Sequence, residues 1–314
     1  MVYAGIDVGG TGIQVGVVDE TGHIIAKSSM VTEVGAPYQE QIAGMARCVQ
    51  EAMNKAGLPM SELKSVGAGV PGLADQKTGM VIYCPNIHWS NVPFRAEFQK
   101  HIDKPVFIDN DATVAGLAES VAGVSAGIEN SVFLTLGTGV GGGIVLGGKV
   151  YSGTNGVGSE LGHMITVIDG ELCTCGNRGC WERYASATAL IRMGREAAEK
   201  HPESRIAASV NGRLDDITAK TVIDAAKEGD EAANEVFERY VYYLCAGLVN
   251  IINFIDPEVI VLGGGVSHAG QFLLDAVNRR LPSMVFYKTM PYARVALATL
   301  GNDAGIIGAA MLGR

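Results

Sequence analysis

Three cysteines and one histidine crowd into the middle of this sequence. They are spaced His163-x9-Cys173-x-Cys175-x4-Cys180, and one imidazole with three thiolates makes a complete tetrahedral ligand set for Zn²⁺. The alternative is a group of free buried thiols beside a core histidine. Because protein ligands would fill all four positions, the spacing predicts a structural zinc that shapes a loop and does no hydrolysis.

Two glutamates flank this cluster. Glu160 lies three residues before His163, and Glu182 lies two residues after Cys180. A bound metal would hold both carboxylates and the imidazole in fixed relative positions. Carboxylates paired with a rigid histidine suit the hydroxyl groups of a sugar. For either glutamate taken alone, the alternative is a solvated surface charge, which is the usual environment of glutamate.

A second polar pair, Asn110-Asp111, follows the apolar segment 106–108 and precedes a helical pattern over 112–122. In a parallel sheet the carboxyl ends of the strands are where ligands bind. Asp111 is therefore either the N-cap of the helix or a catalytic carboxylate, and the two roles do not exclude each other.

Three glycine-rich loops follow predicted strands. They are Asp7-Val8-Gly9-Gly10-Thr11, Gly137-Thr138-Gly139 and Gly263-Gly264-Gly265. The free backbone N–H groups and hydroxyls of such loops can bind phosphates, and a carboxylate at the first strand end can hold Mg²⁺ through water. Tight hairpins are the simpler explanation for either of the first two loops alone. Three such loops together favour a phosphate ligand.

Two familiar nucleotide motifs are rejected because their structural context is wrong. Gly137-x-Gly139-x-x-Gly142 fits a dinucleotide-binding pattern, but a strand and not a helix is predicted after it. The segment 143–149 fits most of a P-loop, but Val150 stands where Ser or Thr must hold magnesium.

The predicted elements fall into two series that begin alike. Strands are expected at 3–8, 13–18, 23–29, 65–70 and 105–109, then at 131–136, 143–146, near 150 and at 259–262. Helices are expected at 38–56, 112–122, 186–200, 219–228, 230–254 and 268–281. Both series start with strand, glycine loop and strand, which indicates an internal duplication and two similar lobes facing a cleft.

Composition excludes several classes of function. The chain has 314 residues with a net charge of −9 and no basic run, so we expect no nucleic-acid partner. Its longest apolar stretch, 240–255, is shorter than the roughly 20 residues that cross a bilayer, so no membrane partner is expected. The first residues have no secretory signal, which predicts a cytoplasmic protein with reduced cysteines.

Five segments resemble the ROK (repressor, open reading frame, kinase) family of sugar kinases. They are the loop 7–11, the Asn110-Asp111-Ala112 turn, the run 158–163, the cluster 173–182 and the segment 301–305. They occur in the family's order along nearly the whole chain. The resemblance implies an α/β, two-lobed actin/hexokinase-like (ribonuclease H-like) fold with a duplicated β-β-β-α-β core. We expect a smaller lobe of 1–115 plus a C-terminal helix 300–314, and a larger lobe of 116–299.

The resemblance also implies roles for individual residues. Asp111 is the expected general base, and the expected sugar-binding residues are Gly72, Asn86, Asn110, Asp111, Glu160, His163 and Glu182. One ring nitrogen of His163 would bind zinc and the other a sugar hydroxyl. ATP and Mg²⁺ are the expected cofactors besides Zn²⁺. The residues implied for them are Asp7, Gly9, Gly10, Thr11, Gly137, Thr138 and Gly139, with the adenosine near Gly264 and Gly265.

The implied reaction is phosphoryl transfer from ATP to a hexose. Glucose, giving glucose 6-phosphate, is favoured because the segment 179–186 resembles the glucokinase branch. Kinases for N-acetylmannosamine or N-acetylglucosamine would use the same motifs. Many family members have a lysine shortly after the first Gly-Gly-Thr, whereas this chain has Gly12, Ile13 and Gln14, which leaves polyphosphate open as an alternative donor.

The competing class is a sugar-sensing repressor, since the family includes proteins with a DNA-binding domain ahead of the sugar kinase fold. The first strand here is predicted from Tyr3 and the charge is acidic, so we expect an enzyme. A non-catalytic sugar sensor would be expected to lack Asp111. The resemblance further implies a homodimer or homotetramer.

Overall fold

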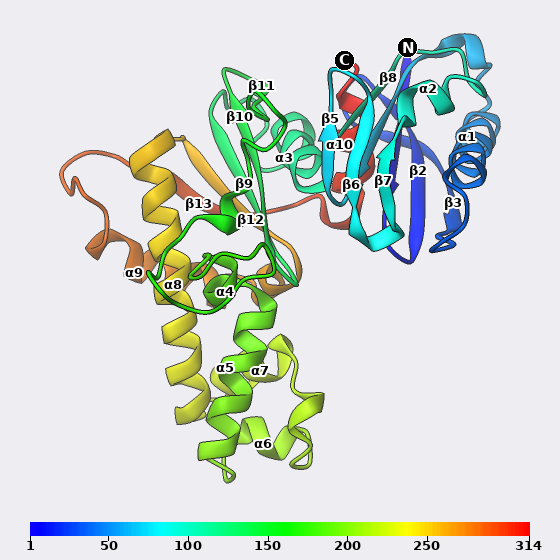
Figure 1. Ribbon diagram of the computed structural model, residues 1–314. Helices are drawn as coiled ribbons and strands as arrows, with labels where there is room; N and C mark the ends of the chain where they lie inside the picture. Colours follow the sequence, from blue (N-terminus) through cyan, green and yellow to red (C-terminus); the bar gives the residue numbers. More distant parts are fainter. The chain divides into compact units, whose positions relative to one another are not determined.

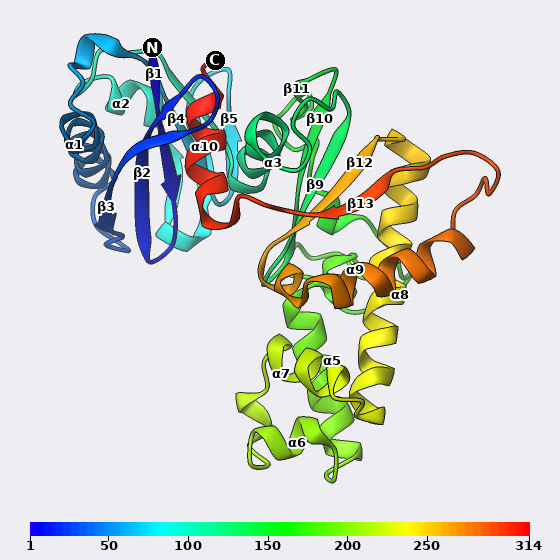
Figure 2. The same cartoon turned by 180° about the vertical axis from the view of Figure 1, so that it is seen from behind.

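The computed structural model describes residues 1–314, which form two compact units (Figures 1 and 2). Unit 1 comprises Met1–Phe133, Gly143–Ser159 and Thr299–Arg314, and unit 2 comprises Leu134–Gly142 and Glu160–Ala298. Residues 116–133 therefore group with unit 1, and the predicted lobe boundary at residue 115 stays a prediction. None of the helices combines the length and apolar character needed to cross a membrane.

The first sheet belongs to unit 1 and has the strand order β3-β2-β1-β4-β8. Its strands are β1 (Val2–Val8), β2 (Gly12–Asp19), β3 (Ile24–Val31), β4 (Leu63–Val70) and β8 (Val106–Asn110). The first three are antiparallel neighbours, whereas β1, β4 and β8 are parallel. The carboxyl ends of β1, β4 and β8 consequently share one edge, where Asp7, Val70 and Asn110 lie.

Helices cover both faces of this sheet. Alternate β1 residues such as Ala4 and Ile6 join a core cluster with α1 (Tyr38–Lys55). The opposite face packs against α10 (Ala304–Met311), and a Cβ built on Gly5 would lie 1.9 Å from the carbonyl oxygen of Ile306. Only glycine allows so close an approach of helix and strand. The helix α3 (Asp111–Ala122) packs against α10.

A small antiparallel sheet of unit 1 was not predicted. It consists of β5 (Leu73–Asp75), β6 (Met80–Cys84) and β7 (Trp89–Val92), followed by α2 (Phe94–Phe98). These strands have three to five residues, which is too short for a hydrophobic period to emerge. The sheet follows β4 directly, so it carries residues 72–92 to the same edge of the first sheet.

The second large sheet repeats the first. Its order is β11-β10-β9-β12-β13, formed by β9 (Ser131–Leu136), β10 (Val140–Leu146), β11 (Lys149–Val150), β12 (Val259–Gly263) and β13 (Arg294–Leu297). The two sheets share the same topological order, so the predicted internal duplication is confirmed. The strand β13 was missed by the sequence analysis. A strand and no helix follows each of the two rejected nucleotide motifs.

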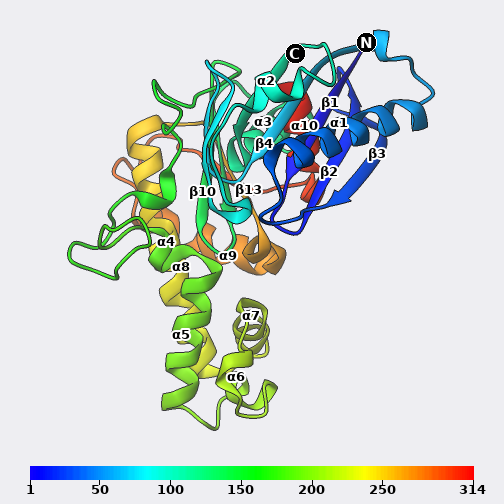
Figure 3. The same cartoon turned by 45° about the vertical axis from the view of Figure 1, so that its right-hand side comes forward.

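The remaining helices belong to unit 2. They are α4 (Glu182–Ala185), α5 (Ala187–Lys200), α6 (Arg205–Ser209), α7 (Ala219–Lys227), α8 (Glu231–Ile255) and α9 (Gln271–Arg280). Figure 3 shows α5 running beside α8 with α6 and α7 next to them. Four of the six were predicted within about three residues at each end, a usual margin. The apolar stretch 240–255 is the second half of α8.

Candidate functional site

The carboxyl end of β8 runs directly into α3. Asn110 is the N-cap of this helix, because its side-chain oxygen accepts hydrogen bonds from the backbone N–H groups of Ala112 and Thr113 at 2.9 and 3.3 Å. Asp111 is the first residue of the helix. The alternative that Asp111 is the N-cap is therefore wrong, since the Asn110 side chain one residue earlier already fills that position.

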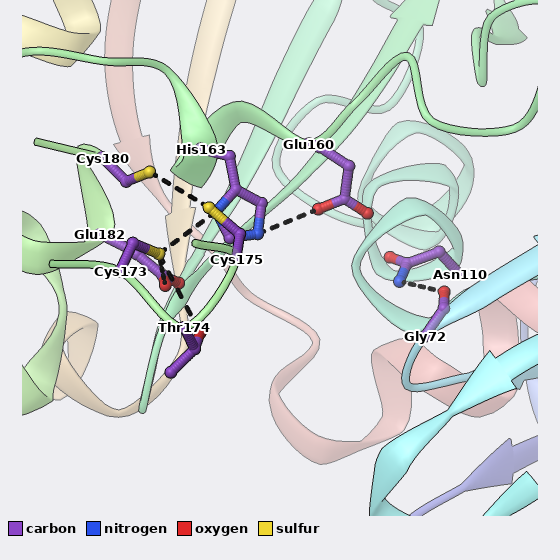
Figure 4. A network of polar contacts seen from close by, with 9 residues as sticks. All are labelled: Gly72, Asn110, Glu160, His163, Cys173, Thr174, Cys175, Cys180 and Glu182. Carbon is purple, nitrogen blue, oxygen red and sulfur yellow. Dashed lines mark hydrogen bonds and ion pairs between the residues drawn. The ribbon is translucent and has the colours of Figure 1, made fainter. Parts of the chain in front are cut away.

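Two further predicted sugar-binding residues of unit 1 lie near this edge. The side-chain amide of Asn110 donates a hydrogen bond to the carbonyl oxygen of Gly72 at 3.0 Å (Figure 4). Gly72 has φ of 154°, and an added Cβ would lie 2.1 Å from the carbonyl oxygen of Tyr83. Asn86 is exposed, with its Cβ 3.7 Å from the Cβ position of Gly10. Gly72 thus touches Asn110, while Asn86 touches the first glycine loop.

The first glycine loop is a tight hairpin between β1 and β2. The N–H of Gly9 donates to the carbonyl oxygen of Gly12 at 3.1 Å, and Thr11 is exposed. Asp7 lies at the end of β1 with its carboxylate against Gly305, where an added Cβ would lie 2.5 Å from Asp7 Oδ2. Burial raises the pKa of Asp7. The segment 301–305 was noted in the sequence only as a motif, and its glycine makes room for this carboxylate.

The four predicted metal ligands of unit 2 come together. Their ligand atoms all lie within 4.8 Å of one another, with Cys173 Sγ 3.7 Å from His163 Nδ1 and Cys175 Sγ 3.6 Å from Cys180 Sγ (Figure 4). Tetrahedral zinc with Zn–S bonds of about 2.3 Å places its ligand atoms about 3.7 Å apart. The donor set and its spacing therefore fit Zn²⁺.

The three thiols of the cluster differ in their pKa. Burial raises the pKa of Cys173, and it raises the pKa of Cys180 to about 12. The backbone N–H of Asn177 has the opposite effect on the exposed Cys175 and lowers its pKa. Two of the three sulfurs would thus stay protonated at neutral pH without a metal, and a coordinated divalent cation removes such protons.

Both predicted glutamates of unit 2 face the cluster. Glu160 Oε2 lies 4.0 Å from Nε2 of His163, the ring nitrogen that points away from the thiols. Glu182 Oε1 lies 3.1 Å from Cys173 Sγ. The imidazole therefore has one nitrogen toward the thiols and one toward a carboxylate, the arrangement expected of a histidine that connects a metal with a polar ligand.

The second and third glycine loops also lie in unit 2. A Cβ added to Gly139 would lie 2.5 Å from Glu182 Oε2, so the Glu182 carboxylate rests on the second loop. The carbonyl oxygen of Gly137 accepts the N–H of Ala187 at 2.8 Å, which fixes the loop to the start of α5. Gly264 has φ of 78° and packs on Leu136, with a Cβ position 2.6 Å from its nitrogen.

The cysteine loop is anchored to α8 by one aromatic residue. Trp181 is fully buried, and its indole N–H donates to the carbonyl oxygen of Tyr243 at 2.8 Å. Gly247 provides the space, since an added Cβ would lie 2.0 Å from the indole ring. The predicted ligand Cys180 and the carboxylate of Glu182 flank this anchor in sequence, so their backbone positions are fixed by core packing.

Comparison with known proteins places the chain in a family. The model of the ROK family matches residues 3–314. The chain belongs to the ROK family. It is 36% identical to a glucokinase of Halalkalibacterium halodurans, over 99% of this chain and 94% of that protein.

Solved ROK structures share the whole fold. A ROK family glucokinase from Streptomyces griseus in complex with glucose and AMPPNP is 35% identical, with a TM-score of 0.82 and 99% of both chains covered. A ROK family transcriptional regulator, a homologue of the E. coli MLC protein, is 27% identical with a TM-score of 0.85. It is matched over 99% of this chain and 77% of its own. The predicted actin/hexokinase-like α/β fold is confirmed.

Proposed function

We propose that this ROK protein transfers the γ-phosphoryl group of ATP to glucose and produces glucose 6-phosphate. The observation that carries the proposal is the similarity over 99% of both chains to a glucokinase solved with glucose and AMPPNP. The polar groups that such a reaction needs are present in both units. The cytoplasmic location predicted from the sequence agrees with an enzyme of this substrate class.

Residues of both units would hold the sugar. In unit 1 these are Gly72, Asn86 and Asn110, at or near the carboxyl edge of the first sheet. In unit 2 these are Glu160, His163 and Glu182 beside the cysteine cluster. Carboxylates accept hydrogen bonds from hydroxyl groups, whereas amide and imidazole N–H groups donate them. Together the six residues offer both kinds of partner to a polyhydroxyl ligand.

Asp111 would serve as the general base. Its carboxylate accepts the proton of the 6-hydroxyl while that oxygen attacks the γ-phosphorus in line and the bond to the ADP oxygen breaks. The phosphates would lie on the loops Gly9–Thr11 and Gly137–Gly139, and the adenosine near Gly264 and Gly265. Backbone N–H groups of such loops stabilise the charge that develops on the transferred group.

Two metal ions complete the proposal. Mg²⁺ bound to ATP neutralises phosphate charge during transfer, and Asp7 is the residue of this chain that would hold it through water. Zn²⁺ would be held by His163, Cys173, Cys175 and Cys180, whose ligand atoms have the right spacing. With its Nδ1 on the zinc, the His163 ring would be held in one orientation, and its Nε2 would stay available to a sugar hydroxyl.

The proposal is tested by measuring ADP release with ATP and Mg²⁺ over a panel of sugars. The panel contains glucose, mannose, fructose, N-acetylglucosamine and N-acetylmannosamine, and the protein is first shown to contain zinc. We expect the highest kcat/KM with glucose. A preference for an acetylated sugar would show that glucose is the wrong substrate, whereas the assignment of phosphoryl transfer would stand. If no sugar is phosphorylated with ATP but glucose is phosphorylated with polyphosphate, the assigned donor is wrong.

A further inference from the structure

Asp109 is a buried carboxylate that the proposed reaction does not use. It lies on β8 directly before Asn110 and Asp111 and is 2% exposed. Its carboxylate has no lysine or arginine partner, and only hydrogen-bond donors face it. Burial of a carboxylate without a counter-ion costs free energy, so the hydrogen bonds from its neighbours must offset this cost. An acidic residue within an apolar strand is also the sequence signal that could have pointed to it.

The hydrogen bonds of Asp109 join three separate segments of unit 1. Oδ1 accepts the backbone N–H of Asn110 at 2.8 Å. Oδ2 accepts the hydroxyl of Ser152, in the loop after β11, at 3.1 Å. Oδ2 also accepts the side-chain amide of Gln76 from the turn after β5. All of these partners donate, so the site requires a group that only accepts.

The Gln76 turn is itself fixed by α2. Arg95 donates from Nη2 to the carbonyl oxygen of Gln76 at 2.6 Å and from Nη1 to that of Lys77 at 2.9 Å. Its Nε donates to the carbonyl oxygen of Val106 at 2.9 Å, at the start of β8. The guanidinium thus ties the turn to the strand that carries Asp109. Hydrogen bonds therefore connect the turn with both ends of β8, through Arg95 at Val106 and through Gln76 at Asp109.

We propose that Asp109 is a positioning residue that fixes the backbone of Asn110 and thereby the direction of the Asp111 carboxylate. The expected effect on kcat rests on the proposed function. Asn110 caps α3 and contacts Gly72, so a shift of its backbone moves the helix start and the predicted sugar-binding edge together. Misplacement of a reacting group by about 1 Å can lower a rate by about 100-fold.

The test begins with Asp109→Asn, which keeps the shape and replaces one acceptor oxygen with a donor. We expect kcat with glucose to fall by at least about tenfold, while KM for ATP changes by less than about twofold. In the double variant Asp109→Asn with Gln76→Glu, the amide at position 109 donates to the carboxylate at position 76, so the hydrogen bond between the two side chains is restored with donor and acceptor exchanged. This variant should recover much of kcat. Ser152→Ala removes a single donor and provides a milder variant if Asp109→Asn does not fold.

Glu119→Gln is the matched control. Glu119 is also fully buried in unit 1, on α3, and accepts the N–H groups of Thr299 and Leu300 at 2.8 and 2.9 Å. Its replacement should lower Tm, but kcat per folded molecule should stay within about twofold of wild type. An unchanged kcat in Asp109→Asn, or an equal loss in both variants, would overturn the positioning role.

A second readout separates this inference from the proposed function. Amide hydrogen exchange of residues 110–113 should be faster in Asp109→Asn than in wild type or Glu119→Gln, whichever reaction the protein catalyses. If the wild type phosphorylates no sugar, the proposed function is wrong and the exchange rates alone decide on Asp109. Equal protection of residues 110–113 in all three proteins would show that Asp109 does not fix this backbone.

Discussion

The proposed chemistry depends first on one carboxylate, Asp111. The Asp111→Asn variant has nearly the same shape but cannot accept the proton of the sugar hydroxyl. We expect kcat to fall by about 100-fold or more, since general base catalysis contributes about 10²- to 10⁴-fold. Glucose binding should stay close to wild type, because the other sugar-binding groups are intact. Turnover measurements and calorimetric titration with glucose check both parts, and a variant with wild-type kcat would remove Asp111 as the base.

Gly139 offers a second test at the scale of single residues. A methyl group there would lie 2.5 Å from Glu182 Oε2 and must displace this carboxylate. We therefore expect Gly139→Ala to raise KM for glucose by about tenfold, the cost of one weakened charge-assisted hydrogen bond. Gly137→Ala is the control, because nothing lies within 4 Å of its added Cβ. A similar KM for glucose in both variants would contradict a sugar-binding role of Glu182.

The loop that carries the cysteines has little regular structure. Between His163 and Glu182 it has only two isolated bridges, Ile165 with Cys180 and Leu172 with Arg178. A loop of this kind needs another source of order, and structural zinc supplies folding free energy directly. A zinc bound by the four predicted ligands would hold this segment in place, as strand pairing does elsewhere in the chain.

Replacement of one ligand tests this dependence. We expect Cys175→Ser to reduce bound zinc from one per chain to a small fraction, to lower Tm, and to weaken glucose binding through His163. Elemental analysis, thermal unfolding and titration with glucose measure the three effects. Cys48→Ser is the control, since Cys48 is a buried thiol of unit 1 outside the cluster. Full zinc content in Cys175→Ser would exclude Cys175 as a ligand.

Elements with a clear period or a glycine boundary were predictable from sequence. The strands β1, β2 and β3 and the helices α1 and α8 are examples, and the cysteine spacing alone identified a cluster that the fold assembles. The strands β5–β7 were missed because they are too short to show alternation. The role of Asp109 was missed for another reason. Its partners Gln76 and Ser152 are 33 and 43 residues away in sequence, and no local pattern encodes such pairs.

At the scale of the whole molecule, the oligomeric state can be measured directly. The homodimer or homotetramer implied by the family resemblance stays a prediction. Multi-angle light scattering at a concentration near that of the kinetic assays gives the mass directly, against 32.9 kDa for one chain. A mass of one chain, unchanged when glucose and ATP are added, would contradict the expected assembly.

The proposed sugar site requires residues of both units to bind the same molecule. Glucose should therefore couple the two units and draw them together, as substrate binding does in enzymes that must exclude water from a phosphoryl group. We expect the radius of gyration from small-angle X-ray scattering to decrease with D-glucose and to stay unchanged with L-glucose. Asp111→Asn should show the same decrease, because it is expected to bind glucose without turning it over. An unchanged radius at saturating D-glucose would mean that one unit binds the sugar alone, and either the unit 1 or the unit 2 residues would then lose their assignment.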